Sequence, residues 1–296
     1  MFAFLNGLDT DLRGELNRRM RELWIHGTDE AEPEEPPPTG ETPLILELRV
    51  KPCGHSLEDY QRDTGHLNAI RRVLEIIGRP DGLSAEDLFA LHRILMARQA
   101  SDPLEPVGDW KAESNGTFIH DESGECVYYQ YADPADVPNL MNRWLMLLNR
   151  DMNAPASMAS AAESALERFA RLHLTFVWIH PFFDGNGRMA RLLSNVPVLK
   201  AGFPPILIPG KRRTEYLRLL DRFKLRQGRA NRNSTLEPPA ECVCGFCEFC
   251  KSSWRESLDL LARARKIQSE RMGIRRSSES ESSGGMEPRS AEIPRT

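Results

Sequence analysis

The chain has 296 residues, 40% of them hydrophobic and 28% charged, and a formal net charge of −4. This length can bury a substantial core, and the charge balance excludes wholesale binding to nucleic acid or to an anionic membrane. No apolar run is long enough to span a bilayer, and the N-terminus lacks the features of a secretory signal. We therefore expect a cytoplasmic protein whose six cysteines are reduced.

The first 55 residues are expected to form a segment of their own. Leu12, Leu16 and Met20 recur at helical spacing, which predicts a helix from Asp9 to His26 with Gly27 as its stop. The stretch "TDEAEPEEPPPTGET" that follows is acidic and rich in proline. Such a composition is typical of an extended segment.

Residues 56–270 are expected to form one mostly helical domain. Ser84, three residues before Asp87, resembles the capped start of a helix. Two β-type runs, Thr117–Ile119 and Cys126–Tyr129, flank the turn-rich "HDESGE" and predict one β-hairpin. Residues 271–296 lack apolar periodicity and are expected to be a disordered tail. The fold class is therefore all-α with one hairpin. Apolar spacing predicts helices over residues 56–77, 84–99, 137–148, 160–179, 211–226 and 246–267, and another after the glycine-rich stretch near residue 187.

The stretch "HPFFDGNGRMARLL" lies where one predicted helix ends and the next begins. His180 continues the apolar face of the preceding helix, and Pro181 is suited to end that helix. His173, seven residues earlier on the same face, is interpreted as a buried structural histidine. A helix that begins near Gly187 presents its first backbone N–H groups to anions, and its dipole adds to the attraction.

The loop between these helices has the composition of a phosphate site. Gly185 and Gly187 lack a Cβ, so a phosphate can approach the backbone. Arg188 and Arg191 lie on one helix face and can reach the same polyphosphate. Asp184 is the single acid, and a carboxylate beside phosphates suits Mg²⁺. With a histidine base these residues predict a phosphate-transfer site. The alternative is a glycine-rich loop after a buried helix, with solvated arginines.

The segment "HPFFDGNGRMAR" resembles the signature of the Fic (Fido) family, His-Pro-Phe-x-Asp/Glu-Gly-Asn-Gly-Arg-x-x-Arg, at every signature position. The resemblance covers roughly Leu12 to Ile267. "GHSLEDYQRDTGHLNAI" and "LSAEDLFALHRILM" resemble two successive helices of the family, the hairpin resembles its flap, and "AGFPPILI" resembles the segment after the motif helix. It implies the helical core of the Fic fold.

This resemblance implies a protein adenylyltransferase that transfers AMP from ATP to a Ser, Thr or Tyr hydroxyl of a target protein. It implies that His180 is the base, that Asp184 binds Mg²⁺, and that Phe182 packs in the core and anchors the loop. The implied anion hole and phosphate-binding residues are Gly185, Asn186, Gly187, Arg188 and Arg191.

The donor nucleotide is the next implication of the resemblance. A lysine in place of Gly187 marks the Doc-type branch, which phosphorylates, so glycine favours adenylyl transfer. Tyr216 matches an aromatic position that lines the adenine pocket, and the alternative is a tyrosine of the helix core. Lys111 and Lys224 depart from the family, which often carries Arg and Asn there, and this leaves the adenine contacts open.

The flap residues Thr117, Phe118 and Ile119 would bind an extended target segment by strand addition. The alternative is a plain surface hairpin.

An inhibitory segment is a further implication. Many members of the family carry Ser/Thr-x-x-x-Glu-Gly/Asn, whose Glu pairs with the second motif arginine, and some of these also remove AMP. Thr28 and Glu32 have this spacing, but Pro33 follows and biases Glu32 away from helical geometry. An inhibitory contact and a solvated linker both stay open.

The stretch "CVCGFCEFC" contains four cysteines, Cys242, Cys244, Cys247 and Cys250. Four thiolates could hold Zn²⁺, although the spacing differs from two separated C-x-x-C pairs. Small buried hydrophobic side chains on a core helix are the alternative.

Three hypotheses about the whole chain follow. The leading one is the adenylyltransferase, with ATP and a target protein as its partners. The others are a catalytically restrained Fic-fold interaction module, and an enzyme that transfers a different nucleotide or phosphocholine. Members of the family often dimerise, so a homodimer is compatible with the resemblance.

Overall fold

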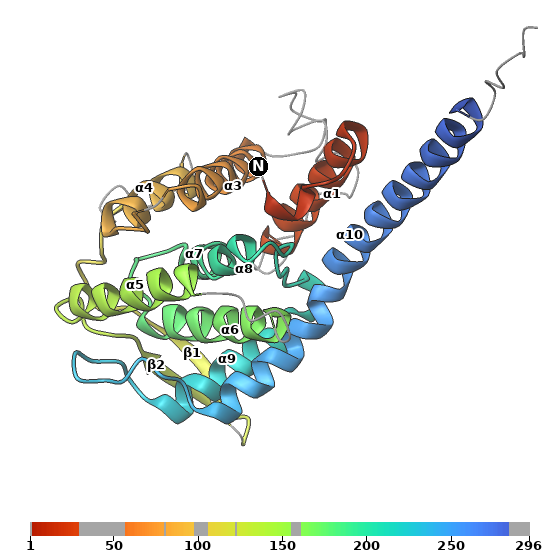
Figure 1. The fold of residues 1–296 in the computed structure, drawn as a ribbon. Coiled ribbons are helices and arrows are strands. Elements are labelled where there is room, and N and C mark those ends of the chain that lie inside the picture. Colours follow the sequence, from red (N-terminus) through yellow and green to blue (C-terminus); the bar gives the residue numbers. More distant parts are fainter. Residues whose placement is uncertain are drawn as a thin grey trace, which may run out of the picture.

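A computed structural model of the chain describes residues 2–29, 57–79, 81–97, 106–121, 123–154 and 161–283. The fold is mostly helical with one two-stranded antiparallel sheet, which confirms the predicted class (Figure 1). Among the described residues no helix combines the length and apolarity needed to cross a membrane. The elements are η1 (Ala3–Leu5), α1 (Thr10–Asp29), α3 (Leu57–Ile77), α4 (Ala85–Leu95), β1 (Gly116–His120), β2 (Cys126–Gln130), α5 (Val137–Asn153), α6 (Ala161–Ile179), α7 (Asn186–Leu193), α8 (Asn195–Lys200), η2 (Gly210–Arg212), α9 (Arg213–Gln227) and α10 (Ala240–Ser283).

Helix α6 is the centre of the domain. Every residue from Leu172 to Ile179 is buried, and a helix that buries all its sides must be covered by other elements. Helices α5, α7, α8, α9 and α10 pack against it, and Figure 1 shows them gathered around it. The C-terminal end of α6 therefore lies inside the protein.

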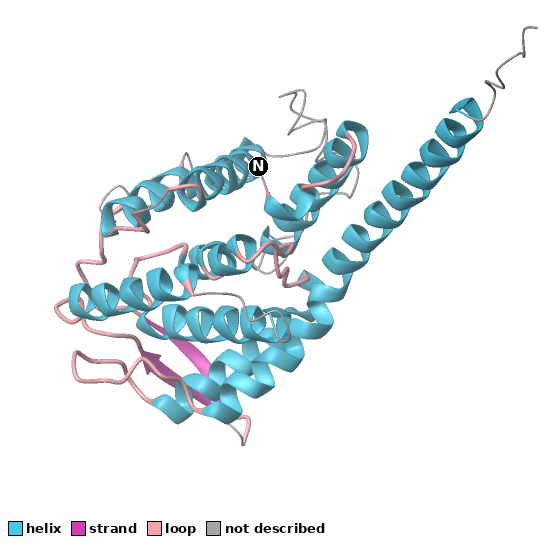
Figure 2. Cartoon of the chain, in the orientation of Figure 1, coloured by secondary structure: helices cyan, strands magenta, loops and turns pink. Residues whose placement is uncertain are grey.

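The hairpin is the predicted one, extended by one residue at both ends of β1 and at the C-terminal end of β2. Gly116 pairs with Gln130 and His120 with Cys126 (Figure 2, magenta). Asp121 closes the turn, since its Oδ1 accepts hydrogen bonds from the N–H groups of Ser123 and Glu125 at 2.9 and 2.8 Å. The hairpin is thus held by local chemistry at its tip.

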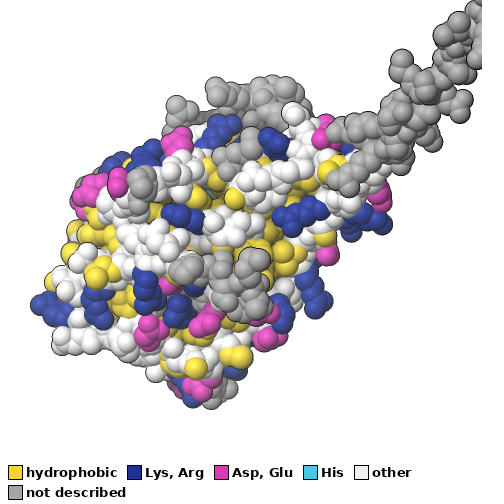
Figure 3. Space-filling view, in the orientation of Figure 1, with side chains coloured by type: hydrophobic (Ala, Val, Ile, Leu, Met, Phe, Trp, Pro, Cys, Tyr) yellow, Lys and Arg dark blue, Asp and Glu magenta, His cyan; other side chains and the backbone are white. Residues whose placement is uncertain are grey.

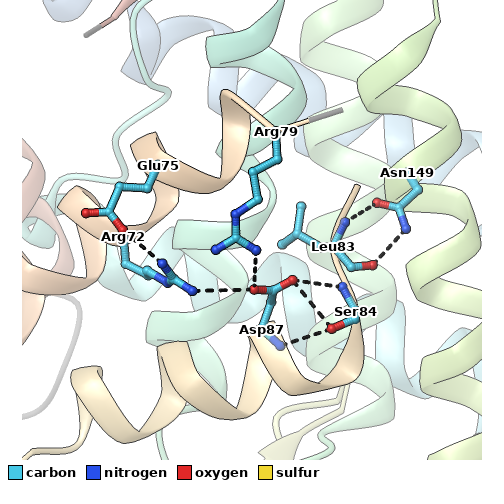
Figure 4. A network of polar contacts seen from close by, with 7 residues as sticks. All are labelled: Arg72, Glu75, Arg79, Leu83, Ser84, Asp87 and Asn149. Atoms are coloured by element: carbon cyan, nitrogen blue, oxygen red, sulfur yellow. Dashed lines mark hydrogen bonds and ion pairs between the residues drawn. The ribbon is translucent and has the colours of Figure 1, made fainter. Parts of the chain in front are cut away.

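The start of α4 is capped as the sequence predicts. Ser84 and Asp87 form a capping box, and the Asp87 carboxylate also pairs with Arg79 at 3.0 Å and Arg72 at 3.8 Å (Figure 4). The Asn149 side chain of α5 donates to the carbonyl of Leu83 and accepts from its N–H, both at 2.8 Å. These contacts join α3, α4 and α5 at one corner.

Replacing Asp87 with alanine should lower the free energy of unfolding by about 1–2 kcal/mol, because a cap and two ion pairs are lost together. Denaturant titration measures the change. Glu86→Ala, an exposed acid in the same helical turn, is the matched control. Equal stability of the two variants would contradict the role assigned to the cap.

Several predicted helix boundaries are wrong, among them the C-terminal ends of α1 and α10. Helix α1 continues past Gly27 to Asp29, and α10 continues to Ser283 through part of the tail expected to be disordered. Arg271 pairs with Asp11 at 2.8 Å, which ties α10 to the start of α1. Extending a docked helix costs less than starting a new one, so α10 propagates without apolar periodicity. Residues 284–296 lie outside the described part of the chain.

The described part of the N-terminal segment joins the main core. Leu16, Met20 and Trp24 of α1 are buried in it, and α1 packs against α3 and α10. On the face drawn in Figure 3, basic and acidic side chains are interspersed among apolar ones. That face carries no continuous stripe of one charge.

Candidate active site

A cavity of about 430 Å³ lies where the flap, the end of α6, the start of α7 and the face of α9 meet. It brings together most of the residues singled out in the sequence. Those that line it are Thr117, Phe118, His180, Asp184, Gly185, Asn186, Gly187, Arg191 and Tyr216. Of the predicted phosphate-site and flap residues, Ile119 and Arg188 do not line it: Ile119 is buried, and the Arg188 guanidinium contacts the Asp184 carboxylate.

His180 is held in an unusual backbone conformation directly after α6. Its φ is 54°, in the left-handed region that non-glycine residues seldom adopt, while its N–H still donates to the Phe176 carbonyl at 2.9 Å. Such strained residues concentrate at functional sites. The turn directs the imidazole out of the helix and into the cavity wall.

The environment of the His180 ring keeps it neutral. Burial, followed by the nearby charges of Lys111 and Lys224, holds the pKa of His180 well below its ordinary value. The ring stacks on Tyr131, with centroids 3.6 Å apart and planes 9° apart. A neutral imidazole with a fixed plane is suited to accept a proton.

The loop after His180 is closed by Asn186. Its Oδ1 accepts from the Phe182 N–H at 2.9 Å, and its Nδ2 donates to the Phe182 carbonyl at 2.8 Å. Phe182 is fully buried, which confirms its predicted place in the core. The Asn186 side chain therefore shapes the loop and leaves its backbone N–H for the cavity.

The start of α7 is built to receive an anion. Its first backbone N–H groups have no carbonyl partner within the helix, and Gly185 at the N-cap offers no side-chain cap. Gly185 has a φ of 73°, and a Cβ there would lie 2.8 Å from Met96 Sδ and 3.3 Å from His92 Nε2. Only glycine fits this position without displacing neighbours.

Replacing Gly185 with alanine should weaken binding of the polyphosphate that the sequence predicts at this loop, probed with ATP, at least tenfold, because the new Cβ forces the loop away from Met96 and His92. Tenfold corresponds to about 1.4 kcal/mol of binding free energy. Calorimetric titration of the variant measures this. Gly124→Ala is the matched control, since Gly124 also has a positive φ, 82°, but nothing within 4 Å of its would-be Cβ. Unchanged binding by the Gly185 variant would contradict a tight loop.

The two motif arginines, both in α7, make different contacts. Both are buried, but only Arg191 lines the cavity. The Arg188 Nη2 contacts the Asp184 carboxylate at 3.3 Å and Met96 Sδ at 3.2 Å. The Asp184 side chain stays 65% exposed at the cavity. Arg188 thus lies against the acid, and Arg191 faces the space that a ligand would fill.

Tyr216 is buried, as a tyrosine of the helix core would be, and it also lines the cavity. Its hydroxyl lies 2.8 Å from Nε2 of His173. His173 is buried as interpreted, between Phe169 and Phe246, and burial lowers its pKa to about 3. The buried histidine therefore has a polar partner that reaches the site.

Four site residues were not predicted as such. Tyr131 and Asp221 line the cavity, while Lys224 lies 3.4 Å from Asp221 and 5.5 Å from the Tyr131 ring centroid. Lys111 is buried, and burial lowers its pKa to about 8. Their signal in the sequence was weak: the two lysines stood out only as departures from the Fic pattern.

The possible zinc site is not formed. Cys242, Cys244, Cys247 and Cys250 lie along one helix, α10, and point to different sides, from exposed Cys244 to buried Cys250. Nowhere in the described part of the chain do three or more His, Cys, Asp or Glu side chains gather to hold a metal ion. The helical rotation of 100° per residue spreads the thiols apart, and burial raises the pKa of Cys247 to about 11.

Of the predicted inhibitory segment, Thr28 lies in the last turn of α1, and Glu32 lies outside the described residues.

Comparisons with known proteins agree with this geometry. Residues 82–197 match the model of the Fic/DOC family. Over 180 residues, 61% of the chain, it is 29% identical to the "Protein adenylyltransferase Fic" of Drosophila ananassae and of Drosophila melanogaster. The match covers 32% and 33% of those proteins, so the chain spans about a third of the length of these relatives.

Two solved structures share the fold. A Fic domain containing signaling protein from Bacteroides thetaiotaomicron superposes with a TM-score of 0.71 at 24% identity, covering 88% of this chain and 92% of that one. Fic-1 from C. elegans gives a TM-score of 0.63 at 24% identity, covering 88% and 69%.

Proposed function

Because the chain contains a Fic/DOC family domain, distantly related to protein adenylyltransferases, we propose that it transfers AMP from ATP to a hydroxyl of a target protein. The observation that carries the proposal is the convergence of three groups on one cavity: neutral His180, the N–H groups at the start of α7, and the carboxylate of Asp184. A base, an anion cradle and a metal ligand are what phosphoryl or nucleotidyl transfer needs.

His180 acts as the base in this proposal. Its Nδ1 is buried, which leaves Nε2 to accept the proton of the target hydroxyl. The hydroxyl oxygen forms a bond to the α-phosphorus of ATP, the bond from that phosphorus to the bridging oxygen breaks, and pyrophosphate leaves. The N–H groups of Asn186 and Gly187 stabilise the charge on the phosphate oxygens, and the Gly185 N–H joins them by exchanging its Asp184 Oδ1 acceptor for a phosphate oxygen. Arg191 holds the outer phosphates, with Arg188 beside Asp184.

Asp184 fits a magnesium site. Mg²⁺ is commonly held by one or two carboxylates together with substrate phosphates and water, and the exposed Asp184 side chain offers one carboxylate at the cavity. Bound there, Mg²⁺ would neutralise charge on the phosphates. The positive charges of Lys111 and Lys224 disfavour protonation of His180 in the absence of nucleotide. Bound anionic phosphates would weaken this effect.

The orientation of the nucleotide decides between adenylyl transfer and phosphorylation. Gly187 supports adenylyl transfer, because the phosphorylating Doc-type relatives carry lysine there. Added to a lysate, the chain should increase protein labelling from [α-³²P]ATP above that of the lysate alone and should leave labelling from [γ-³²P]ATP unchanged. Label from the γ position alone would replace this proposal with phosphorylation. Loss of α-labelling on adding UTP or CDP-choline, but not on adding ADP, would favour another donor.

The flap is proposed to hold the target. Phe118 is 70% exposed and both Thr117 and Phe118 border the cavity, so an extended segment paired with β1 would carry its hydroxyl toward His180. Ile119 is 1% exposed and instead anchors the strand to the body. Tyr216, with Leu217 and Leu220, is proposed to border the adenine.

Glu32 is proposed to restrain the enzyme by pairing with Arg191. Glu32→Gly should therefore raise self-labelling from [α-³²P]ATP, by about tenfold if the contact contributes 1.4 kcal/mol. Glu35→Gly removes the same charge from the same leader and is the control. Equal labelling by the wild type and the Glu32 variant would remove the restraint, and with it any role of Glu32 in removing AMP.

A further inference from the structure

His92 joins three separate parts of the site. It lies on α4, fully buried, far from the loop in sequence and next to it in space. Its Nδ1 accepts a hydrogen bond from the Gly108 N–H at 2.9 Å, and its Nε2 lies 3.0 Å from the Asp184 carbonyl oxygen. Its ring stacks on Phe182, with centroids 3.9 Å apart and planes 6° apart.

These contacts define which ring nitrogen carries the proton. A backbone N–H can only donate, so Nδ1 must be the acceptor and Nε2 must carry the hydrogen. A carbonyl oxygen can only accept, so Nε2–H donates to Asp184. One neutral tautomer thus satisfies both neighbours, and each neighbour requires it.

The Asp184 carbonyl, which accepts the hydrogen bond of His92, lies where the loop turns into α7. Directly after it the chain turns through left-handed Gly185, whose N–H donates to the Asp184 Oδ1 at 2.6 Å. A rotation of the Asp184–Gly185 peptide would move the carboxylate and the first N–H groups of α7 together. Fixing this peptide sets both the metal-binding carboxylate and the anion cradle.

The other nitrogen ties this loop to the base of the flap. Gly108 lies in the segment that leads to β1. Two further hydrogen bonds join this segment to the loop: the Lys111 N–H donates to the Pro181 carbonyl at 3.0 Å, and the Asn115 Nδ2 donates to the Phe183 carbonyl at 3.3 Å. His92 is the side chain that hydrogen-bonds both to Gly108 in this segment and to the carbonyl of Asp184.

We propose that His92 is a positioning residue that holds the Asp184–Gly185 peptide in the orientation that binds nucleotide phosphates, and that it does so through Nε2–H. This rests on the proposed function for its consequence in catalysis, but its structural claim concerns the loop alone. His92 touches no substrate.

Two isosteric variants separate the roles of the ring nitrogens. The amide nitrogen of glutamine can occupy the place of Nε2, so His92→Gln keeps a donor for the Asp184 carbonyl and loses the acceptor for Gly108. His92→Asn keeps an acceptor at the place of Nδ1 and loses the donor. Both lose the stack on Phe182, so neither differs from the other in that respect.

The first measurement is amide hydrogen exchange over residues 182–189 in the full chain without nucleotide. We expect exchange in this peptide to speed up about tenfold or more in His92→Asn, and to stay within about threefold of wild type in His92→Gln. The second is the affinity for ATP with Mg²⁺, expected to fall about tenfold in His92→Asn alone. The two variants should melt at similar temperatures.

Equal exchange in the two variants, or faster exchange in His92→Gln, would overturn the proposal. So would a loss of affinity that follows the melting temperature in both variants, because a purely structural histidine would act that way. If wild type transfers no AMP, the proposed function fails, while the exchange measurement still decides the role of His92.

Discussion

Replacing His180 with alanine should lower the rate of AMP transfer by roughly 10²- to 10⁴-fold, since a positioned general base contributes about that much. We expect ATP to bind as before, because the proposed phosphate contacts come from α7 and Arg191, which line the cavity, rather than from the imidazole. The rate is measured with [α-³²P]ATP and the affinity by calorimetry, so that chemistry and binding are reported separately.

His120→Ala is the control for this experiment. His120 is an exposed histidine at the end of β1, and its removal should leave both quantities unchanged. A His180 variant that transfers AMP at the wild-type rate would contradict the role of His180 as the base. If the wild type and the Glu32→Gly variant both bind ATP but transfer no AMP, the interaction module is favoured instead.

Acidification from pH 7.5 to 5.5 should destabilise the fold steeply. Burial lowers the pKa of His92 to about 4 and of His173 to about 3, and it holds that of His180 well below the ordinary value of about 6.5. The unfolded chain takes up these protons below pH 6.5 and the native chain does not. The stability that these neutral histidines contribute is therefore fully present above pH 6.5 and is lost as the pH falls toward their pKa values in the native state.

Below pH 6.5 the free energy of unfolding should fall by about 1.4 kcal/mol per pH unit for each histidine, or by about 4 kcal/mol per pH unit for the three together. Urea denaturation at three pH values measures it. His173→Phe should reduce the slope by about a third. Tyr216→Phe breaks the same hydrogen bond but keeps the histidine, so it should keep the full slope. An unreduced slope in His173→Phe would show that its protonation is not linked to folding.

The sequence by itself determined the local features of this protein. Apolar spacing along α6 delivers His180 from the inside of the domain, because side chains three and four apart share a face. Ser84 and Asp87 cap α4, the Asp121 turn closes the flap, and Gly185 precedes α7. Each of these rests on interactions within a few residues, which is the range over which spacing carries information.

Only the tertiary structure decided what surrounds the His180 ring. Tyr131 stacks on His180, and Lys111 and Lys224 approach it from segments far away in the chain. His92 meets Asp184 across 92 positions. No periodicity predicts such pairs, since they arise when separately formed helices pack.

The cysteines and the arginines illustrate the same limit. Cys242 and Cys244 are two residues apart but lie on opposite sides of α10, because a helix rotates 100° per residue, and Cys244 is exposed while Cys242 is partly buried. Arg188 and Arg191 share a helix face, yet packing against Met96 and Asp184 turns one away from the cavity that the other lines. Spacing places side chains on an element, and the neighbours of that element decide which of them reach the site.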